Sequence, residues 1–212
     1  MPRGFFTYSV PSTTKFLGIT WTISLFGGKL TTEAARLKAL DEIVNWTNPG
    51  PGGFYDDLGN IAQQPHLLRG AGFDRDPGFL ASPRVGFEED LVPDEPDEKH
   101  EGARRKSWID HAEPLFDAPL QMRYTGLDPQ ARYKLHVVYG GDAPKKTIRL
   151  VANDNIVIHP LIKKEFPFKP VEFDIPVEAT RTGELTLSWF REPGLGGNGR
   201  GCQVSEVWLM KK

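Results

Sequence analysis

The chain has 212 residues, of which 39% are hydrophobic and 25% are charged, and a formal net charge of -2. This composition suffices for one well-packed core, with or without an appendage. It argues against sequence-independent nucleic-acid binding, which needs a concentrated positive field, so we expect no nucleic-acid partner. We also expect no membrane span, because the longest apolar stretch near the N-terminus, residues 16–28, is shorter than the roughly 20 residues that a bilayer requires.

Residues 1–30 stay unassigned. Arg3 and Lys15 precede a short, threonine-containing apolar segment, which fits a secretory signal, a first strand or a remnant of a longer protein. The lone cysteine, Cys202, excludes an internal disulfide and leaves the cellular compartment open.

Residues 31–46 have the spacing of a helix. Leu37, Leu40 and Val44 recur at intervals of three and four residues, and either of the threonines before Glu33 can cap the helix. The proline and glycine residues that follow end it, since proline lacks the amide hydrogen and glycine relaxes the backbone. We expect this helix to lie outside the sheets predicted below, either packed on a sheet edge or as the link to a preceding domain.

The segment from the end of this helix to residue 106 lacks any periodicity. Proline, glycine and charged residues recur through it, yet so do aromatic residues, which are rare in disordered chains. We therefore assign residues 31–106 to a helix plus a long, ordered, loop-rich wrap over a sheet. Its acidic run, residues 88–98, is expected to form a solvated loop, with cation binding as the alternative. A structural calcium ion therefore stays open, no other cofactor is expected, and any metal site is unknown.

From residue 107 onward the sequence predicts one short strand after another. Apolar and polar residues alternate with the two-residue period of a half-buried strand, and turns rich in glycine, asparagine and aspartate separate the runs. The expected strands centre on residues 120–124, 133–139, 148–152, 156–159, 171–175, 184–190 and 202–209.

No helix-sized segment interrupts these runs, so we predict an all-β fold, an antiparallel two-sheet β-sandwich over residues 107–212. Parallel strands joined by helices would contradict this prediction. The residues expected in the core of the sandwich are Tyr133, Leu135, Val137, Ile148, Leu150, Phe173, Leu185 and Leu187.

A glycine-rich loop, residues 191–201, lies between the last two runs. Its glycines allow backbone conformations with positive φ, so the loop can hold polar side chains in a fixed array. In the run before it, Trp189 has the parity of the core leucines and is expected to be buried. In the run after it, Trp208 has the opposite parity from its apolar neighbours and is expected to be partly exposed, with a bulge near Ser205.

The order of these strands and the pattern of the terminal run, residues 204–209, resemble the galactose-binding-like β-sandwich. This jelly-roll plan is shared by malectin-like and related carbohydrate-binding modules. The resemblance covers roughly residues 107–210 and rests on strand order, without a diagnostic ligand motif. Residues 46–59 also resemble the entry to the C-terminal portion of large uncharacterised bacterial proteins linked to polysaccharide breakdown. The resemblance implies an accessory module, extracellular or periplasmic, that holds a plant-type or bacterial polysaccharide.

Catalytic arrangements compete with this interpretation. The serine, aspartate and histidine within residues 107–113 are too close along one chain to form a triad without a specific fold around them. The glycine-rich loop lacks the lysine-serine pair and the following helix of a phosphate-binding loop, and the histidines lack metal-ligand spacing. An acid–base pair could come from Asp56, Asp57, Asp110 and Glu113, which would make the chain a small polysaccharide lyase or glycoside hydrolase.

Binding chemistry finds more support in the sequence. Sugars present apolar faces to aromatic rings and hydroxyl groups to charged or amide side chains, and both kinds of side chain flank the glycine-rich loop. We therefore favour an accessory binding domain with a polysaccharide or oligosaccharide partner, and leave enzyme activity open. A structural or assembly domain of a larger protein is the third alternative, and the oligomeric state and the glycan stay open. The residues expected to bind the ligand are Trp108, His111, Arg191, Asn198, Arg200, Tyr55 and Asp57.

Overall fold

The computed structural model describes residues 32–69, 84–86, 108, 110–114, 117–141, 146–166, 168–194 and 201–212. The chain divides into two compact units, residues 1–46 and 47–212. The first unit contains α2, Glu33–Val44, which confirms the predicted helix. The Thr32 hydroxyl accepts a hydrogen bond from the main-chain nitrogen of Ala35 at 3.2 Å, so the second of the two candidate threonines caps it.

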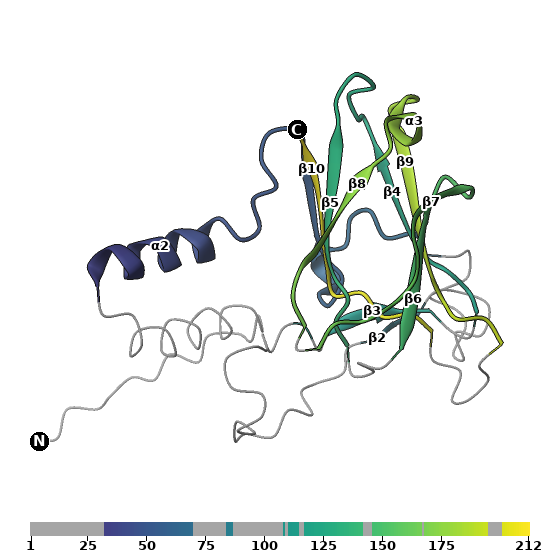
Figure 1. Cartoon of the computed structure of the whole chain (residues 1–212), viewed down its shortest axis with the longest axis horizontal. Helices are drawn as coiled ribbons and strands as arrows, with labels where there is room; N and C mark the ends of the chain where they lie inside the picture. Colours follow the sequence, from purple (N-terminus) through teal and green to yellow (C-terminus); the bar gives the residue numbers. More distant parts are fainter. Residues whose placement is uncertain are drawn as a thin grey trace, which may run out of the picture. The chain divides into compact units, whose positions relative to one another are not determined.

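The second unit is a sandwich of two four-stranded antiparallel sheets (Figure 1), which confirms the predicted fold class. One sheet has the order β1-β10-β5-β8 and the other the order β4-β9-β6-β7. Alternating sequences produce this arrangement, because each strand offers one apolar face that is buried only against another sheet. The strands are β1 Phe54–Asp57, β4 Leu120–Thr125, β5 Tyr133–Val138, β6 Thr147–Ala152, β7 Ile156–Lys163, β8 Val171–Ile175, β9 Glu184–Arg191 and β10 Glu206–Lys211.

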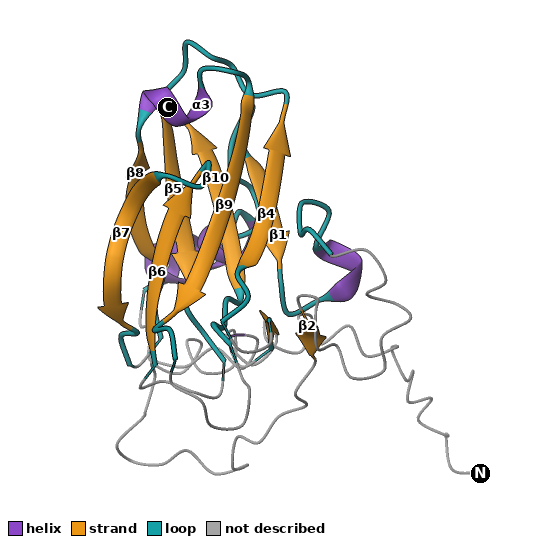
Figure 2. Cartoon of the chain, turned by 90° about the vertical axis from the view of Figure 1, so that its right-hand side faces the viewer, coloured by secondary structure: helices purple, strands orange, loops and turns teal. Residues whose placement is uncertain are grey.

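Short elements lie at the ends of the sandwich. β2, Arg84–Gly86, pairs with β3, His111–Glu113, at one end, and α3, Val177–Thr180, lies at the other (Figure 2). The 3-10 helix η1, Ile61–Gln63, follows β1. Helical structure in this unit is therefore limited to short segments within the described residues.

The core lies between the two sheets and matches the predicted list. All of the predicted core residues except Phe173 are buried, and Phe173 is partly buried and packs against the cluster. The register explains this, because Leu187 faces Met122 across β9 and β4, and Leu135 faces Phe173 across β5 and β8. Trp189 is fully buried, as its parity predicted.

The sandwich contains a strand that the alternation did not predict. β1 pairs with β10 and forms the edge of its sheet, although its sequence, Phe-Tyr-Asp-Asp, carries two carboxylates. Both carboxylates are buried and accept hydrogen bonds from donors described below. The strand is therefore stabilised by polar contacts as well as apolar ones, which sequence periodicity cannot reveal.

Two expectations for the last strand are corrected. Trp208 is buried, with 5% of its surface exposed, because the rings of Tyr55 and His136 flank it at 5.1 and 5.0 Å on the neighbouring strands. The irregularity expected near Ser205 has another form: Val204 makes an isolated bridge to Ala112, and the strand proper begins at Glu206. The predicted acidic loop of residues 88–98 lies outside the described residues.

Candidate functional site

The segment after β1 crosses from one sheet to the other along an edge of the sandwich. It leaves the first sheet at Leu58, whose main-chain nitrogen donates to Ser205 O at 2.8 Å. It reaches the second sheet at Leu67, which bridges Met122 on the edge strand β4. Hydrogen bonds from Leu68 N to Gln121 O, 2.8 Å, and from Arg123 N to His66 O, 2.9 Å, extend this pairing. Residues 58–69 therefore close this edge.

An open pocket of about 500 Å³ lies on this crossing segment. Its volume falls within the range of about 300–1,000 Å³ that is typical of small-molecule sites. We call it the Tyr55 pocket, because Tyr55 supplies its aromatic ring. The lining combines that ring with apolar side chains, amide groups and one guanidinium group: Tyr55, Ala62, Gln63, Gln64, Pro65, Leu67 and Arg69.

A buried carboxylate fixes the aromatic wall of the pocket. Glu206, at the start of β10, accepts a hydrogen bond from the Tyr55 hydroxyl at Oε1 and one from Trp108 Nε1 at Oε2, both at 2.9 Å. Hydrogen bonds to a charged acceptor are roughly twice as strong as neutral ones. Two of the predicted binding residues, Tyr55 and Trp108, are thus brought together by a glutamate that the sequence analysis did not single out.

Trp108 itself is buried rather than open to a ligand. Its carbonyl accepts hydrogen bonds from Gly141 N at 2.7 Å and from the Ser205 hydroxyl at 2.9 Å. A Cβ atom at Gly140 would lie 2.0 Å from the same carbonyl, so this close approach requires glycine. The buried indole therefore holds the Glu206 carboxylate in place through the hydrogen bond from its Nε1.

The guanidinium group of the pocket is held by an amide. Arg69 donates from one of its terminal nitrogens to Gln64 Oε1 at 2.9 Å, and Gln64 Nε2 donates to the carbonyl of Leu58 at 2.6 Å. Because the Leu58 carbonyl can only accept, the amide nitrogen of Gln64 must face it and the amide oxygen must face Arg69. The main chain at Leu58 thus sets the direction of the Arg69 side chain.

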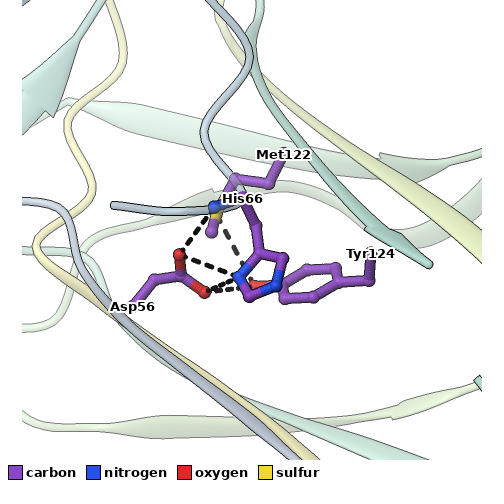
Figure 3. A network of polar contacts seen from close by, with 4 residues as sticks. All are labelled: Asp56, His66, Met122 and Tyr124. Atoms are coloured by element: carbon purple, nitrogen blue, oxygen red, sulfur yellow. Dashed lines mark hydrogen bonds and ion pairs between the residues drawn. The ribbon is translucent and has the colours of Figure 1, made fainter. Parts of the chain in front are cut away.

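A second buried carboxylate ties the crossing segment to β1 (Figure 3). Asp56 accepts hydrogen bonds from the main-chain nitrogen of His66 at 3.1 Å, from His66 Nδ1 at 2.9 Å and from the Tyr124 hydroxyl at 3.2 Å. The His66 ring stacks on Tyr124 with centroids 4.6 Å apart and meets Phe54 edge-on at 5.0 Å. Burial, followed by the charge of Asp56, raises the pKa of Tyr124 well above its ordinary value, so the hydroxyl stays a donor.

The other predicted site residues lie around the β3 end of the sandwich or beyond the described part. Asp57 is buried, stands opposite Glu206 in the strand register, and accepts from Gly59 N at 3.2 Å. His111 is buried with its Nε2 3.5 Å from Glu113 Oε2. Arg191 is buried in an ion pair described next, and Asn198 and Arg200 lie outside the described residues.

Asp117 fastens the start of the glycine-rich loop. Its Oδ1 lies 2.9 Å from Arg191 Nε and its Oδ2 accepts from Gly194 N at 3.1 Å. The hydrogen bond from Gly194, followed by that from Arg191, lowers the pKa of Asp117. Gly194 adopts a positive φ of 74°, a conformation that glycine reaches without strain. Arg191 thus has a structural partner in addition to any ligand.

Three of the four carboxylates considered for acid–base chemistry are buried, and the fourth, Asp110, is partly exposed. Asp56, Asp57 and Glu113 are buried, and Glu113 accepts from Gln203 Nε2 at 3.3 Å, which in turn accepts from the buried Lys164 at 3.1 Å. None of the three lines the Tyr55 pocket. Their burial favours roles in holding loops and strands together.

A metal-binding cluster and a membrane-spanning helix are both absent from the part of the chain that the structure describes. There, no group of three or more histidine, cysteine, aspartate or glutamate side chains is placed to hold a metal ion. No helix within those residues is long and apolar enough to cross a membrane.

No protein-family model matches the chain, and no curated protein matches it. Several solved structures are similar at low identity. One is β-glucuronidase 2 of Bacteroides uniformis bound covalently to cyclophellitol-6-carboxylate aziridine, with 8% identity, a TM-score of 0.43 and 76% of this chain covered. Another is the complex of the plant peptide RALF23 with FER and LLG2, with 13% identity, a TM-score of 0.42 and 76% coverage.

A third similar structure is the mosquito-larvicidal Cry4Aa toxin of Bacillus thuringiensis, with 10% identity, a TM-score of 0.29 and 48% of this chain covered. This chain spans 18% of the β-glucuronidase chain, 46% of the matched chain in the plant complex and 19% of the toxin chain. Such distant likenesses leave the function to be argued from the residues of this chain.

Proposed function

We propose that this chain is a non-catalytic carbohydrate-binding module, and that the Tyr55 pocket holds part of a polysaccharide or oligosaccharide. The observation that carries the proposal is the composition of the pocket: a fixed aromatic ring stands with two glutamines and an arginine around a space of about 500 Å³. A sugar ring has an apolar face for Tyr55 and a rim of hydroxyl groups for the amides and the guanidinium group.

Rigidity supports this role. Tyr55 is held by Glu206, Arg69 by Gln64, and the backbone between them by Asp56 through His66. A side chain that is already ordered loses little conformational entropy when a ligand arrives, which improves affinity. The pocket also lies on a loop carried by two sheets, a common place for binding residues.

Binding is favoured over catalysis because the pocket lining contains no carboxylate among the described residues. Glycoside hydrolysis ordinarily uses a pair of carboxyl groups on either side of the scissile bond, whereas Asp57 and Glu206 are buried and do not line the pocket. An accessory module of this kind would work in an extracellular or periplasmic compartment, where polysaccharides are found. That location is part of the proposal.

The test is a panel of soluble and insoluble glycans, assayed both for retention of the protein and for new reducing ends. We expect saturable retention on at least one glycan without new ends, and loss of that retention in Tyr55→Ala. Val157→Ala, a change at an exposed apolar residue on the far edge strand β7, is the matched control and should bind normally. New reducing ends that depend on the protein would show that the chain is an enzyme and would contradict the proposal. Retention that Tyr55→Ala leaves unchanged would show that the glycan binds somewhere other than the Tyr55 pocket.

A further inference from the structure

We infer that the outer face of the β4-β9-β6-β7 sheet is a surface on which a second copy of this chain docks. The inference is independent of the proposed function. Figure 2 looks onto this face, where the four strands lie side by side and no described helix or strand crosses them. The face presents apolar, aromatic, polar and charged side chains that are exposed or partly exposed: Val157, Leu161, Phe190, Thr147, Thr186, Gln121, Arg149 and Lys163.

Arg149 lies on one of the two central strands of this face. Its guanidinium carbon is 4.9 Å from the centroid of the Phe190 ring, on the opposite residue of β9, and no carboxylate among the described residues pairs with it. The neighbouring strand β7 exposes 55% of Val157 and 41% of Leu161. Arginine and aromatic residues beside exposed apolar side chains are typical of the centre of protein–protein interfaces.

The edge strand β7 is protected against pairing with a further strand. Its register against β6 shifts twice, between Ile148 and Leu150 and again between Leu150 and Val151. Pro160, within β7, lacks an amide hydrogen. Bulges and proline are means by which edge strands avoid edge-to-edge association. A second copy is therefore expected on the face of this sheet and not along its edge.

The face is complementary to itself under a two-fold rotation. Its midline runs between β9 and β6, so an axis along that midline places β6 of each copy against β9 of the other. Arg149 and Phe190 are opposite each other in the register, so each meets the other residue of the second copy. Thr147 pairs with Lys163 on β7 and donates to Glu192 at 3.3 Å on its other side. The rotation thus brings Lys163 toward Glu192 of the second copy, and opposite charges meet on both sides of the axis.

The size of the face predicts a weak dimer. Four strands about 4.8 Å apart, with about six residues at about 3.3 Å each, give a planar footprint of about 400 Å² on each copy. The relief of the side chains raises the accessible area covered, and a total of about 1,000 Å² is the size of weak, reversible complexes. We therefore expect a dissociation constant on the order of 10 µM.

The test is sedimentation velocity of the full chain at concentrations from about 1 to about 300 µM, which bracket the expected dissociation constant. We expect the sedimentation coefficient to rise from that of a monomer to that of a dimer. Leu161→Glu and Arg149→Glu should each weaken association at least about tenfold, because each places an unpaired carboxylate in the contact. Val177→Glu and Arg181→Glu make the same changes at exposed positions in and after α3 and should associate like the wild type. Thermal melts verify that each variant is folded.

A charge exchange tests the two-fold arrangement itself. Lys163→Glu alone and Glu192→Lys alone should each weaken association, because like charges then meet across the axis. The double variant should recover most of the wild-type association, since opposite charges meet again in exchanged positions. A double variant that associates no better than either single variant would overturn this arrangement.

The remaining outcomes are equally decisive. A wild-type chain that stays monomeric at every concentration would overturn the inference. Association that Val177→Glu weakens as much as Leu161→Glu would also overturn it, because the contact would then not be specific to this face. A soluble oligosaccharide should bind the Leu161→Glu variant as tightly as the wild type, so the dimer and the proposed function can fail separately.

Discussion

The hydroxyl of Tyr139 lies 2.6 Å from Nε2 of His159 in the interior of the sandwich. His159 Nδ1 lies 2.8 Å from the carbonyl of Pro160, which can only accept, so Nδ1 carries the hydrogen and Nε2 accepts from Tyr139. Trp189 Nε1 donates in turn to the Tyr139 hydroxyl at 3.2 Å. This chain of donors and acceptors is complete only while His159 is neutral.

The first prediction is a loss of stability in mild acid. Burial lowers the pKa of His159 below its ordinary value of 6.5. Below about pH 6.5, His159 therefore takes up a proton more readily in the unfolded chain than in the folded chain. The contribution of His159 is therefore fully present above about pH 6.5 and is lost as the pH falls toward its folded pKa. Urea unfolding of the wild type and His159→Gln between about pH 7.5 and pH 5 measures it.

We expect the free energy of unfolding to fall more steeply with acid in the wild type than in His159→Gln. Burial also lowers the pKa of His136, but that residue is present in both proteins and cancels in the difference. Parallel pH profiles for the two proteins would contradict a neutral, buried His159.

The second prediction concerns strand parity. Leu187 on β9 is fully buried opposite Met122, whereas Thr186 lies on the other face and is partly exposed. Leu187→Ala should lower the free energy of unfolding by about 2–5 kcal/mol, because it removes buried methyl groups and leaves a cavity. Thr186→Ala should change it by less than about 1 kcal/mol. Equal shifts in the urea midpoint would contradict the observed register.

The third prediction concerns Asp56. Asp56→Ala should cost about 2–4 kcal/mol, because the buried Tyr124 hydroxyl and the partly buried His66 would lose their shared acceptor. Tyr124→Phe should cost less, about 1–2 kcal/mol, since it removes one donor and leaves the carboxylate bonded to His66. Chemical denaturation ranks the two, and a larger cost for Tyr124→Phe would show that the hydroxyl, not the histidine, is the principal partner.

A fourth prediction uses Cys202 as a reporter of unfolding. The thiol is buried, its Sγ lies 3.3 Å from the carbonyl of Trp189, and burial raises its pKa to about 12. It should therefore react with thiol reagents only when the sandwich opens, because the thiolate is the reactive form. Labelling in increasing urea should follow the global unfolding curve, and rapid labelling in native buffer would show that the β10 end opens locally.

The strands could be predicted from sequence wherever one face is apolar and the other polar. The two-residue spacing of Leu185, Leu187 and Trp189 predicts a buried face, and the structure places all three in the core. The same rule failed for Trp208. It lies on the opposite face of its strand from the core residues Val207 and Leu209, but the rings of Tyr55 and His136 cover it. Parity indicates which side of a sheet a residue occupies, and only the fold shows whether that side is covered.

The candidate site was less predictable because its contacts are long-range. Tyr55 was expected to bind ligand, and it lines the pocket, but its partner Glu206 lies 151 residues away in sequence. Gln64 and Arg69 stand in a segment without periodicity, so no pattern singled them out. The available signal was Glu206, a charged residue directly before the apolar residues Val207, Trp208 and Leu209 of a predicted strand, since a buried carboxylate needs donors from elsewhere in the chain.

Hydrogen exchange locates the binding surface without any substitution. The wild-type protein would be incubated in deuterated buffer with and without a retained glycan, and exchange would be compared peptide by peptide. We expect slower exchange in residues 58–69 when the glycan is bound, because a ligand in the Tyr55 pocket stabilises the native crossing segment against local unfolding. Exchange in β6 and β7 should be unchanged. Protection confined to β6 and β7, or to the segment around Gly194, with none in residues 58–69, would contradict a saccharide site at Tyr55.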